Sequence, residues 1–269
     1  MREPRIALVT GASSGIGRAI AARLAADRYR VYGTSRNPAK ATPLPGVTLV
    51  PLDVTTEASV EQCVATLLAA EGRLDLLVNN AGIAVVGAIE EVPLALARQQ
   101  FDTNYFGVVR LIQAVLPAMR RQGAGHIINV SSVAGLVPIP FAGQYSASKY
   151  ALEGLTEVLR SEVALFGIRV ALVEPGFYRS ELVGAAATPE RLVSAYDGPR
   201  SRVHERMRAI EAAAPPPTEV AEVVLRLARH PDPPLRTLVG KERIFALLKR
   251  FLPFALFEPN GRRYWRLSA

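Results

Sequence analysis

The sequence has a single cysteine, one tryptophan and only four lysines among its 32 basic residues. One cysteine excludes a disulfide within the chain, so we expect a reducing compartment, the cytoplasm. Cys63 falls in a helical pattern of apolar residues, and we interpret it as a small core residue. The chain also lacks an apolar run long enough to span a bilayer, and its first ten residues are too weakly apolar for a signal peptide.

Histidine is scarce as well, and His126, His204 and His230 do not have the spacing of metal ligands, so we expect no metal. The formal net charge is +8, with local arginine clusters at 200–208 and 262–266. No aromatic stacking pattern or DNA-binding motif accompanies either cluster, and we expect no nucleic-acid partner. A solvated surface is the simple interpretation, while an acidic partner protein stays an alternative.

Short apolar runs alternate with segments of helical period along most of the 269 residues. This alternation predicts a Rossmann-type α/β fold in one domain over 1–269, with a doubly wound, mainly parallel sheet flanked by helices on both faces. The predicted strands cover 5–10, 30–35, 48–53, 74–79, 126–131 and 169–173. The predicted helices cover 15–28, 60–68, 101–119, 145–166 and 218–229.

Two segments depart from the alternation. Residues 177–216 show no clear period, and we interpret them as a substrate-binding segment that is either a lid or disordered. The C-terminal extension, 241–269, is apolar with basic residues, and a helix there would end before Pro253. It could cover the substrate cleft, join a subunit contact or lie on a membrane surface through 243–257; we favour the first two.

A glycine-rich turn joins the first predicted strand to the first predicted helix. Its glycines let the backbone approach a pyrophosphate, and the helix N-terminus supplies free amides and a positive dipole end. The spacing Gly-x-x-x-Gly-x-Gly differs from the usual Gly-x-Gly-x-x-Gly pattern. The predicted cofactor-binding residues of this turn are Gly11, Ser13, Ser14, Gly15, Ile16 and Gly17.

The end of the second predicted strand indicates which dinucleotide binds. An NAD site has an acidic residue about 20 residues beyond the glycines, to bind the ribose hydroxyls. This chain has Ser35 and Arg36 there, and a guanidinium can pair with a 2′-phosphate. We therefore expect NADP(H), with NAD(H) as the less favoured cofactor. Further predicted contacts are Asp53 and Val54 near the adenine, and Asn80, Ala81 and Gly82 below a ribose.

Tyr145 and Lys149 stand four residues apart, so they share one face of a helix. On that face the ammonium can lower the pKa of the phenol and make it an acid or base near neutral pH. Addition of hydride to a carbonyl needs such an acid for the developing alkoxide.

With these motifs in place, the chain resembles the short-chain dehydrogenase/reductase family, in its single-domain branch. The resemblance rests on motifs that follow one another in the family's order: Thr10 to Gly17, Asp53, Asn79 to Gly82, Asn104, Ser132, Tyr145, Lys149 and Pro175-Gly176. It implies that Ser132 orients the substrate, although the adjacent Ser131 stays an alternative. It also implies that Lys149 holds the nicotinamide ribose and that Asn104 supports a water near it. Pro175, Gly176 and Ser180 would contact the nicotinamide end.

The substrate is the least specified part of the prediction. Apolar residues in 133–141 and after Gly176 favour an apolar pocket, and 145–177 look most similar to hydroxysteroid and retinol dehydrogenase-like members. We expect a bulky apolar ketone or secondary alcohol. One alternative is a 3-oxoacyl reductase acting on an acidic acyl carrier protein, and another is a nucleotide-sensing regulator without turnover. The resemblance further implies a homodimer or homotetramer.

Overall fold

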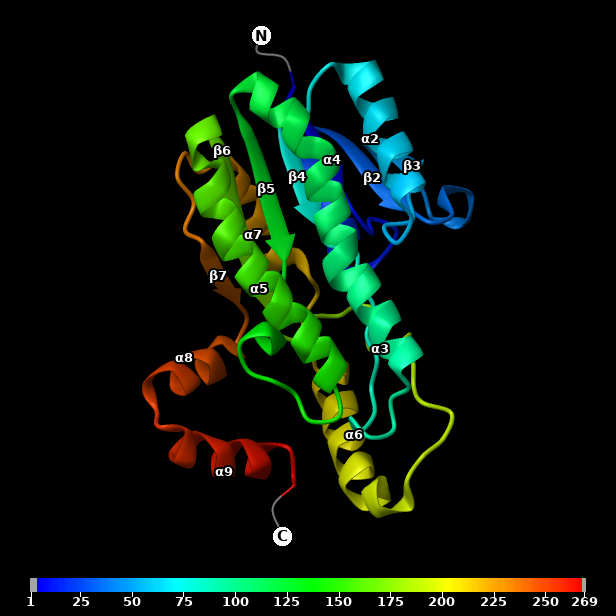
Figure 1. Cartoon of the computed structure of the whole chain (residues 1–269), viewed down its shortest axis with the longest axis vertical. Coiled ribbons are helices and arrows are strands. Elements are labelled where there is room, and N and C mark those ends of the chain that lie inside the picture. Colours follow the sequence, from blue (N-terminus) through cyan, green and yellow to red (C-terminus); the bar gives the residue numbers. More distant parts are fainter. Residues whose placement is uncertain (1–3, 268–269) are drawn as a thin grey trace.

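A sheet of seven parallel strands forms the centre of the computed structural model, which describes residues 4–267 (Figure 1). The strands stand in the order β3-β2-β1-β4-β5-β6-β7. The order reverses between β1 and β4, and ligands bind at such a reversal, beyond the carboxyl ends of the strands. The strands are β1 (Ile6–Val9), β2 (Arg30–Ser35), β3 (Val47–Pro51), β4 (Leu76–Asn79), β5 (Gly125–Val130), β6 (Ile168–Pro175) and β7 (Arg236–Val239).

Helices cover both faces of the sheet, as predicted. The helices are α1 (Gly15–Ala26), α2 (Glu57–Glu71), α3 (Leu94–Phe101), α4 (Gly107–Gln122), α5 (Gly143–Val163), α6 (Asp197–Ala212), α7 (Thr218–Arg229), α8 (Arg243–Phe251) and α9 (Phe254–Tyr264). One buried apolar cluster joins α1 and α7 to the strands, and a second joins α2, α4 and α5 to the opposite face. Cys63 lies in the second cluster, where burial raises the pKa of its thiol to about 11, which confirms it as a core residue.

The predicted helix 101–119 is wrong in its first part. α3 ends at Phe101, a π-helical turn follows over Asp102–Phe106, and α4 begins at Gly107. Such wide turns are frequent at functional sites. This one carries Asn104, which is fully buried.

β7 and α6, like nearly all of α3, have no counterpart among the predicted strands and helices. β7 is a short edge strand whose first three residues are only half-buried, so it lacks a buried apolar run. α6 lies inside 177–216, and its inward side holds Val203, Met207 and Ile210 together with Arg200. Arg200 is buried because it pairs with Glu91 and Asp197. A charged residue on the buried side interrupts the apolar pattern, so the sequence did not show the period of a helix.

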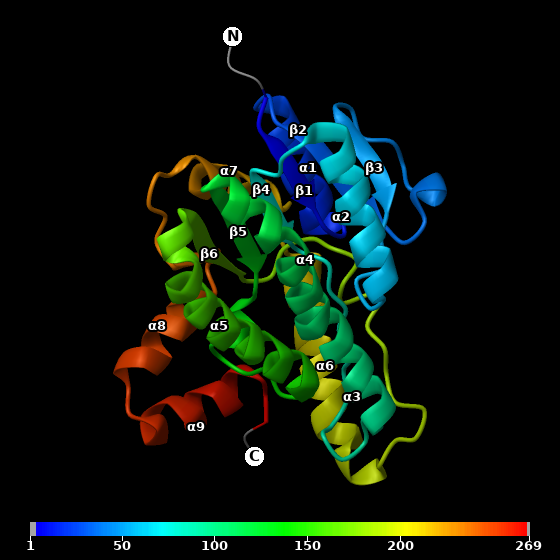
Figure 2. The same ribbon diagram turned by 45° about the horizontal axis from the view of Figure 1, so that its top comes forward.

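α8 and α9 lie at the edge of the molecule, beyond the carboxyl ends of β6 and β7 (Figures 1 and 2). The predicted helix before Pro253 is therefore confirmed, and a second helix follows it. None of the helices described within residues 4–267 is both long enough and apolar enough to cross a bilayer.

Candidate active site

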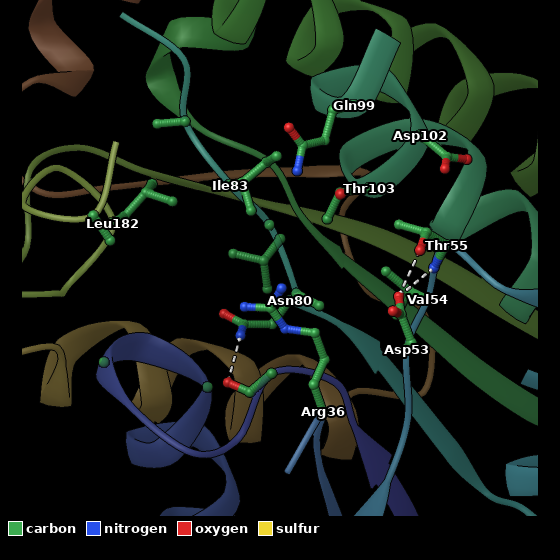
Figure 3. Close-up of a pocket in the computed structure, with 18 of the residues that line it drawn as sticks. Arg36, Asp53, Val54, Thr55, Asn80, Ile83, Gln99, Asp102, Thr103 and Leu182 are labelled. Carbon is green, nitrogen blue, oxygen red and sulfur yellow. Dashed lines mark hydrogen bonds between the residues drawn. The ribbon is translucent and has the colours of Figure 1, made fainter. Parts of the chain in front are cut away.

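A cleft of about 1480 Å³ opens at the carboxyl ends of the strands, where the order of the sheet reverses (Figure 3). The loops after β1, β2, β3, β4 and β5 line it, together with the start of α5 and residues 180–185. All the predicted cofactor residues except Pro175 and Gly176 line this cleft. The sequence motifs therefore converge on one place although they are spread over most of the chain.

The glycine-rich turn forms one end of the cleft. Gly11 and Gly15 have φ angles of +65° and +52°, which side chains with a Cβ rarely adopt. The side chain of Ser14 does not cap α1, so the first amides of the helix point free toward the cleft. Free amides at a helix N-terminus, next to backbone without side chains, fit the pyrophosphate of a dinucleotide.

Gly17 is needed for a different reason, because a Cβ there would overlap the carbonyl oxygen of Gly11 and the amide nitrogen of Asn80. We expect Gly17→Ala to lower the free energy of unfolding by about 1–3 kcal/mol, since the backbone must shift. We also expect NADPH affinity to fall at least about tenfold, because the shift displaces the turn. Urea unfolding and NADPH titration measure the two effects.

Gly154 gives the matched control, because a Cβ at this position of α5 meets nothing within 4 Å. Gly154→Ala should leave NADPH binding unchanged and stabilise the fold by up to about 1 kcal/mol. Equal NADPH affinities of the two alanine variants would refute the role given to Gly17.

Thr10 and Asn80 tie the glycine-rich turn to the loop after β4. The Thr10 hydroxyl accepts hydrogen bonds from the amides of Asn80 and Ala81, each at 2.9 Å. The Asn80 side chain donates to the carbonyl oxygens of Thr10 and Gly11, at 2.9 and 3.3 Å. Asn80 was predicted as part of a ribose floor, and the structure adds that it braces the turn. Thr10 was not predicted as a site residue, although it directly precedes the glycines.

Arg36 lies at the edge of the cleft, exposed, just after β2 (Figure 3). Lys40 also lines this edge and was missed, because nothing in its local sequence marks it. Asp53 accepts two hydrogen bonds from Thr55 through Oδ1, at 2.9 and 2.7 Å. These bonds hold the pKa of Asp53 below its ordinary value, so the carboxylate is ionised and can accept further bonds.

Ser132, Tyr145 and Lys149 lie together where β5 ends and α5 begins. The Ser132 hydroxyl donates to the Pro175 carbonyl at 3.4 Å and accepts from the Ala134 amide at 3.1 Å, and it lies close enough to the Tyr145 phenol to affect its pKa. Lys149 Nζ lies 5.9 Å from the centre of the Tyr145 ring and donates to the Val130 carbonyl oxygen at 2.9 Å. The neighbouring Ser131 is buried and also lines both cavities, but Ser132 is the serine that acts on the pKa of Tyr145.

The pKa of Tyr145 corrects one expectation from the sequence. Burial raises this pKa, and the nearby Ser132 hydroxyl only opposes the rise. Lys149 does not lower it, because its ammonium is directed at Val130 rather than at the phenol oxygen. Burial lowers the pKa of Lys149 itself to about 8, so the ammonium still carries its charge at neutral pH. Tyr145 keeps its proton under the same conditions, as a proton donor must.

Asn104 is held by the π-helical turn against the loop after β4. Its Oδ1 accepts from the Ile83 amide at 2.9 Å, and its Nδ2 donates to the Ile83 carbonyl at 3.0 Å and to Ser148 Oγ at 3.1 Å. Ser148 directly precedes Lys149 on α5. Asn104 thus joins the loop after β4 to the helix that carries Tyr145, and Gly82 packs beside its Oδ1.

A pair of buried acidic residues lies one helical turn beyond Lys149, and no sequence motif indicated it. Glu153 follows Lys149 by four residues on α5, and Glu174 is fully buried near the end of β6. Arg236 on β7 lies 3.0 Å from Glu153 and 3.4 Å from Glu174. Burial and the adjacent Glu153 together raise the pKa of Glu174 to about 8, although Arg236 opposes the rise. The folded chain therefore holds a proton on Glu174 at neutral pH.

This proton makes stability depend on pH. The folded pKa of Glu174 exceeds its unfolded value of 4.5, so its contribution is full below about pH 4.5 and is lost as pH rises toward 8. We expect the free energy of unfolding to fall by roughly 1–3 kcal/mol between pH 5 and pH 8.5. Glu174→Gln, which stays neutral, should flatten this fall in urea unfolding at several pH values. Glu157→Gln, at the half-exposed partner of the same arginine, should keep it; equal slopes in both variants would contradict the assignment.

A second cavity, of about 550 Å³, adjoins the cleft. Its walls are largely apolar and come from 133–142, from 175–183 and from α8 and α9. Ser132 and Tyr145 line it, and so do Pro175, Gly176 and Ser180. Tyr145 and Ser180 line both cavities, and Ser180 packs against Gly15. The polar cleft and the apolar cavity thus meet at Tyr145.

Metal ligands do not gather in this region. Within residues 4–267, no three His, Cys, Asp or Glu side chains are grouped as a metal site requires. His126 is buried, and burial lowers its pKa to about 3, so it stays neutral.

Comparison with known proteins gives consistent matches. A family model described as short chain dehydrogenase matches residues 5–191. A 3-ketodihydrosphingosine reductase of Bacteroides thetaiotaomicron is 38% identical over 98% of this chain and 99% of its own length. The human 17-beta-hydroxysteroid dehydrogenase type 1 is 34% identical over 96% of this chain and 83% of its own length.

Solved structures agree with the fold. A short-chain dehydrogenase from Streptomyces avermitilis superimposes with a TM-score of 0.81 at 34% identity, over 99% of this chain and 97% of that one. A relative from Burkholderia phymatum, solved with NAD, has a TM-score of 0.77 at 28% identity, over 93% and 94% of the two chains. A metagenomic oxidoreductase solved with NADP has a TM-score of 0.68 at 29% identity, over 87% and 96%.

Proposed function

Because the chain belongs to the short-chain dehydrogenase family, whose members act on alcohols and carbonyls, we propose that it is an NADP(H)-dependent reductase of bulky apolar ketones. The observation that carries this proposal is the position of Tyr145 between a polar cleft and an apolar cavity. A substrate in the cavity and a nicotinamide in the cleft would meet at this side chain. The same site would also catalyse the reverse reaction, oxidation of the corresponding secondary alcohols.

The cleft fits a phosphorylated dinucleotide. The free amides at the start of α1 would hold the pyrophosphate, and Arg36, with Ser13 and Ser14 nearby, would hold a 2′-phosphate. Asp53 and Val54 would contact the adenine, while Asn80, Ala81 and Gly82 would lie under a ribose. Pro175, Gly176 and Ser180 would border the nicotinamide. When bound, the reduced nicotinamide supplies the hydride.

Tyr145 donates the proton in this mechanism. Its hydroxyl and that of Ser132 line the same cavity, so the two groups could bind one carbonyl oxygen between them and polarise it. The charged Lys149, one helical turn after Tyr145, would hold the hydroxyls of the nicotinamide ribose. Asn104 fixes the loop after β4 relative to α5, the helix that carries Lys149.

The apolar cavity supports the substrate class. A volume of about 550 Å³ with a few polar groups at one end suits a bulky apolar molecule that carries one ketone. The relatives named for 3-ketodihydrosphingosine and for 17-beta-hydroxysteroids point the same way, since both names denote large apolar compounds. We also propose a homodimer or homotetramer through α4 and α5, where Val158 stands exposed.

A ketone screen with purified protein tests the proposal. NADPH and NADH oxidation would be followed with long-chain 3-ketones, steroidal ketones, short ketones and 3-oxoacyl groups on an acyl carrier protein. Turnover should be fastest with NADPH and the bulky free ketones. Much faster reduction of the carrier-bound substrate would favour a 3-oxoacyl reductase, and cofactor binding without any turnover would favour a regulator.

A further inference from the structure

The outer side of α8 and α9 is unusually apolar for a surface that meets water. Seven of the fourteen exposed large apolar side chains of residues 4–267 stand on these helices and the turn between them. Phe251 is 76% exposed, Phe254 68% and Leu256 58%. Apolar groups gathered in this way mark an interaction surface. We propose that α8 and α9 dock the protein onto an anionic lipid membrane and admit apolar substrate from it.

α8 has two apolar sides with different surroundings. At about 100° per residue, Ile244, Leu247 and Phe251 fall within one narrow arc, and all three are exposed. Phe245 lies on another side and lines the apolar cavity. Lys249 fixes this inner side, because its ammonium donates to the Leu136 carbonyl at 2.6 Å and bonds the Tyr150 hydroxyl. The outer arc is therefore left for a partner that the described residues do not supply.

The charges around this arc suit an anionic surface. Residues 241–267 contain seven basic side chains and two acidic ones. Glu242 is buried, and Glu258 already pairs with Arg262 at 2.8 Å. Arg243 and Arg250 border the exposed arc on one side and are themselves exposed. An apolar face bordered by arginines is the pattern of helices that lie in the membrane interface beside anionic lipids.

A second copy of the chain fits this face less well. In a symmetric dimer the same patch meets itself, so the arginines of both copies would come together. No free acidic side chain within 241–267 would neutralise them. Anionic lipid headgroups supply that negative charge, and the acyl region takes up Phe251, Phe254 and Leu256.

The same helices form a wall of the apolar cavity. Leu248, Leu252, Phe254 and Phe257 line it, and Leu248, Leu252 and Phe254 are also exposed on the outside. A molecule dissolved in the bilayer could therefore pass between these side chains toward Tyr145 without entering water. Delivery of substrate rests on the proposed function, whereas docking itself does not.

Sedimentation with lipid vesicles tests the docking without cofactor or substrate. The protein should bind vesicles of phosphatidylcholine with phosphatidylglycerol, and bind phosphatidylcholine alone much more weakly. The double variant Phe251→Ser with Leu256→Ser, whose two residues are exposed and do not line the apolar cavity, should reduce the partition coefficient at least about tenfold, since two large apolar side chains are lost from the bilayer. Leu165→Ser is the matched control, because Leu165 is also 76% exposed but stands just beyond the far end of α5; it should bind as the parent does.

Two results would overturn the proposal. One is that the parent does not bind vesicles, or that the double variant binds them as strongly as the parent does. The other is a halved solution mass in the double variant with no vesicle binding by the parent, which would assign the face to a second copy. NADPH oxidation with a short, water-soluble ketone should be equal in parent and double variant, so failure of docking and failure of the proposed reaction are read separately.

Discussion

Tyr145→Phe should reduce the turnover number with NADPH and a good ketone by roughly 10²- to 10⁴-fold, the usual contribution of a positioned proton donor. The ring stays, so packing beside Lys149 and NADPH affinity should change little. Steady-state kinetics and NADPH titration of the same preparation separate the two effects.

Tyr32→Phe serves as the control for loss of a tyrosine hydroxyl. Tyr32 lies on β2 and donates to Glu71, and neither residue lines the cleft, so this variant should keep full turnover. Full turnover by Tyr145→Phe as well would remove Tyr145 from the mechanism.

Arg36→Ala should raise the KM for NADPH by about 10- to 100-fold and leave the KM for NADH nearly unchanged. Hydrogen bonds to a charged group contribute about 1.5–3 kcal/mol, and each 1.4 kcal/mol corresponds to about tenfold in affinity. NADH has no 2′-phosphate, so it loses nothing when the guanidinium is removed. Initial rates at saturating ketone with each cofactor give both constants.

Arg121→Ala is the matched control, since Arg121 is exposed near the end of α4, away from the cleft. It removes the same charge from the chain, so a general effect of net charge would appear in both variants. An equal rise of KM for NADH and NADPH in Arg36→Ala would contradict a 2′-phosphate contact and leave the choice of dinucleotide to other residues, such as Lys40.

The sequence was most informative where local chemistry determines local structure. The glycines of 11–17 need positive φ or close backbone approach, and both requirements are met in the structure. The alternation of apolar runs with helical periods arises because parallel strands are buried on both faces, and the fold follows from it. Tyr145 and Lys149 could be paired because helix geometry alone places them on one face.

Features that depend on distant residues could not be predicted. The buried pair of Glu153 and Glu174 joins α5 to β6, and only folding brings Arg236 beside them. The pKa of Tyr145 was predicted in the wrong direction because the sequence does not reveal how far the phenol is buried or where the Lys149 ammonium points. α6 was missed because Arg200, buried through its partner Glu91, interrupts an otherwise regular apolar pattern.

Transfer of deuterium from labelled cofactor tests the central claim most directly. The purified protein would be given NADPH that carries deuterium at both positions of nicotinamide C4, together with the best ketone of the screen. The proposed mechanism predicts one deuterium on the carbinol carbon of the product for each NADPH oxidised. NADPH oxidation with an unlabelled alcohol, or no reduction of any apolar ketone by protein that binds NADPH, would contradict it.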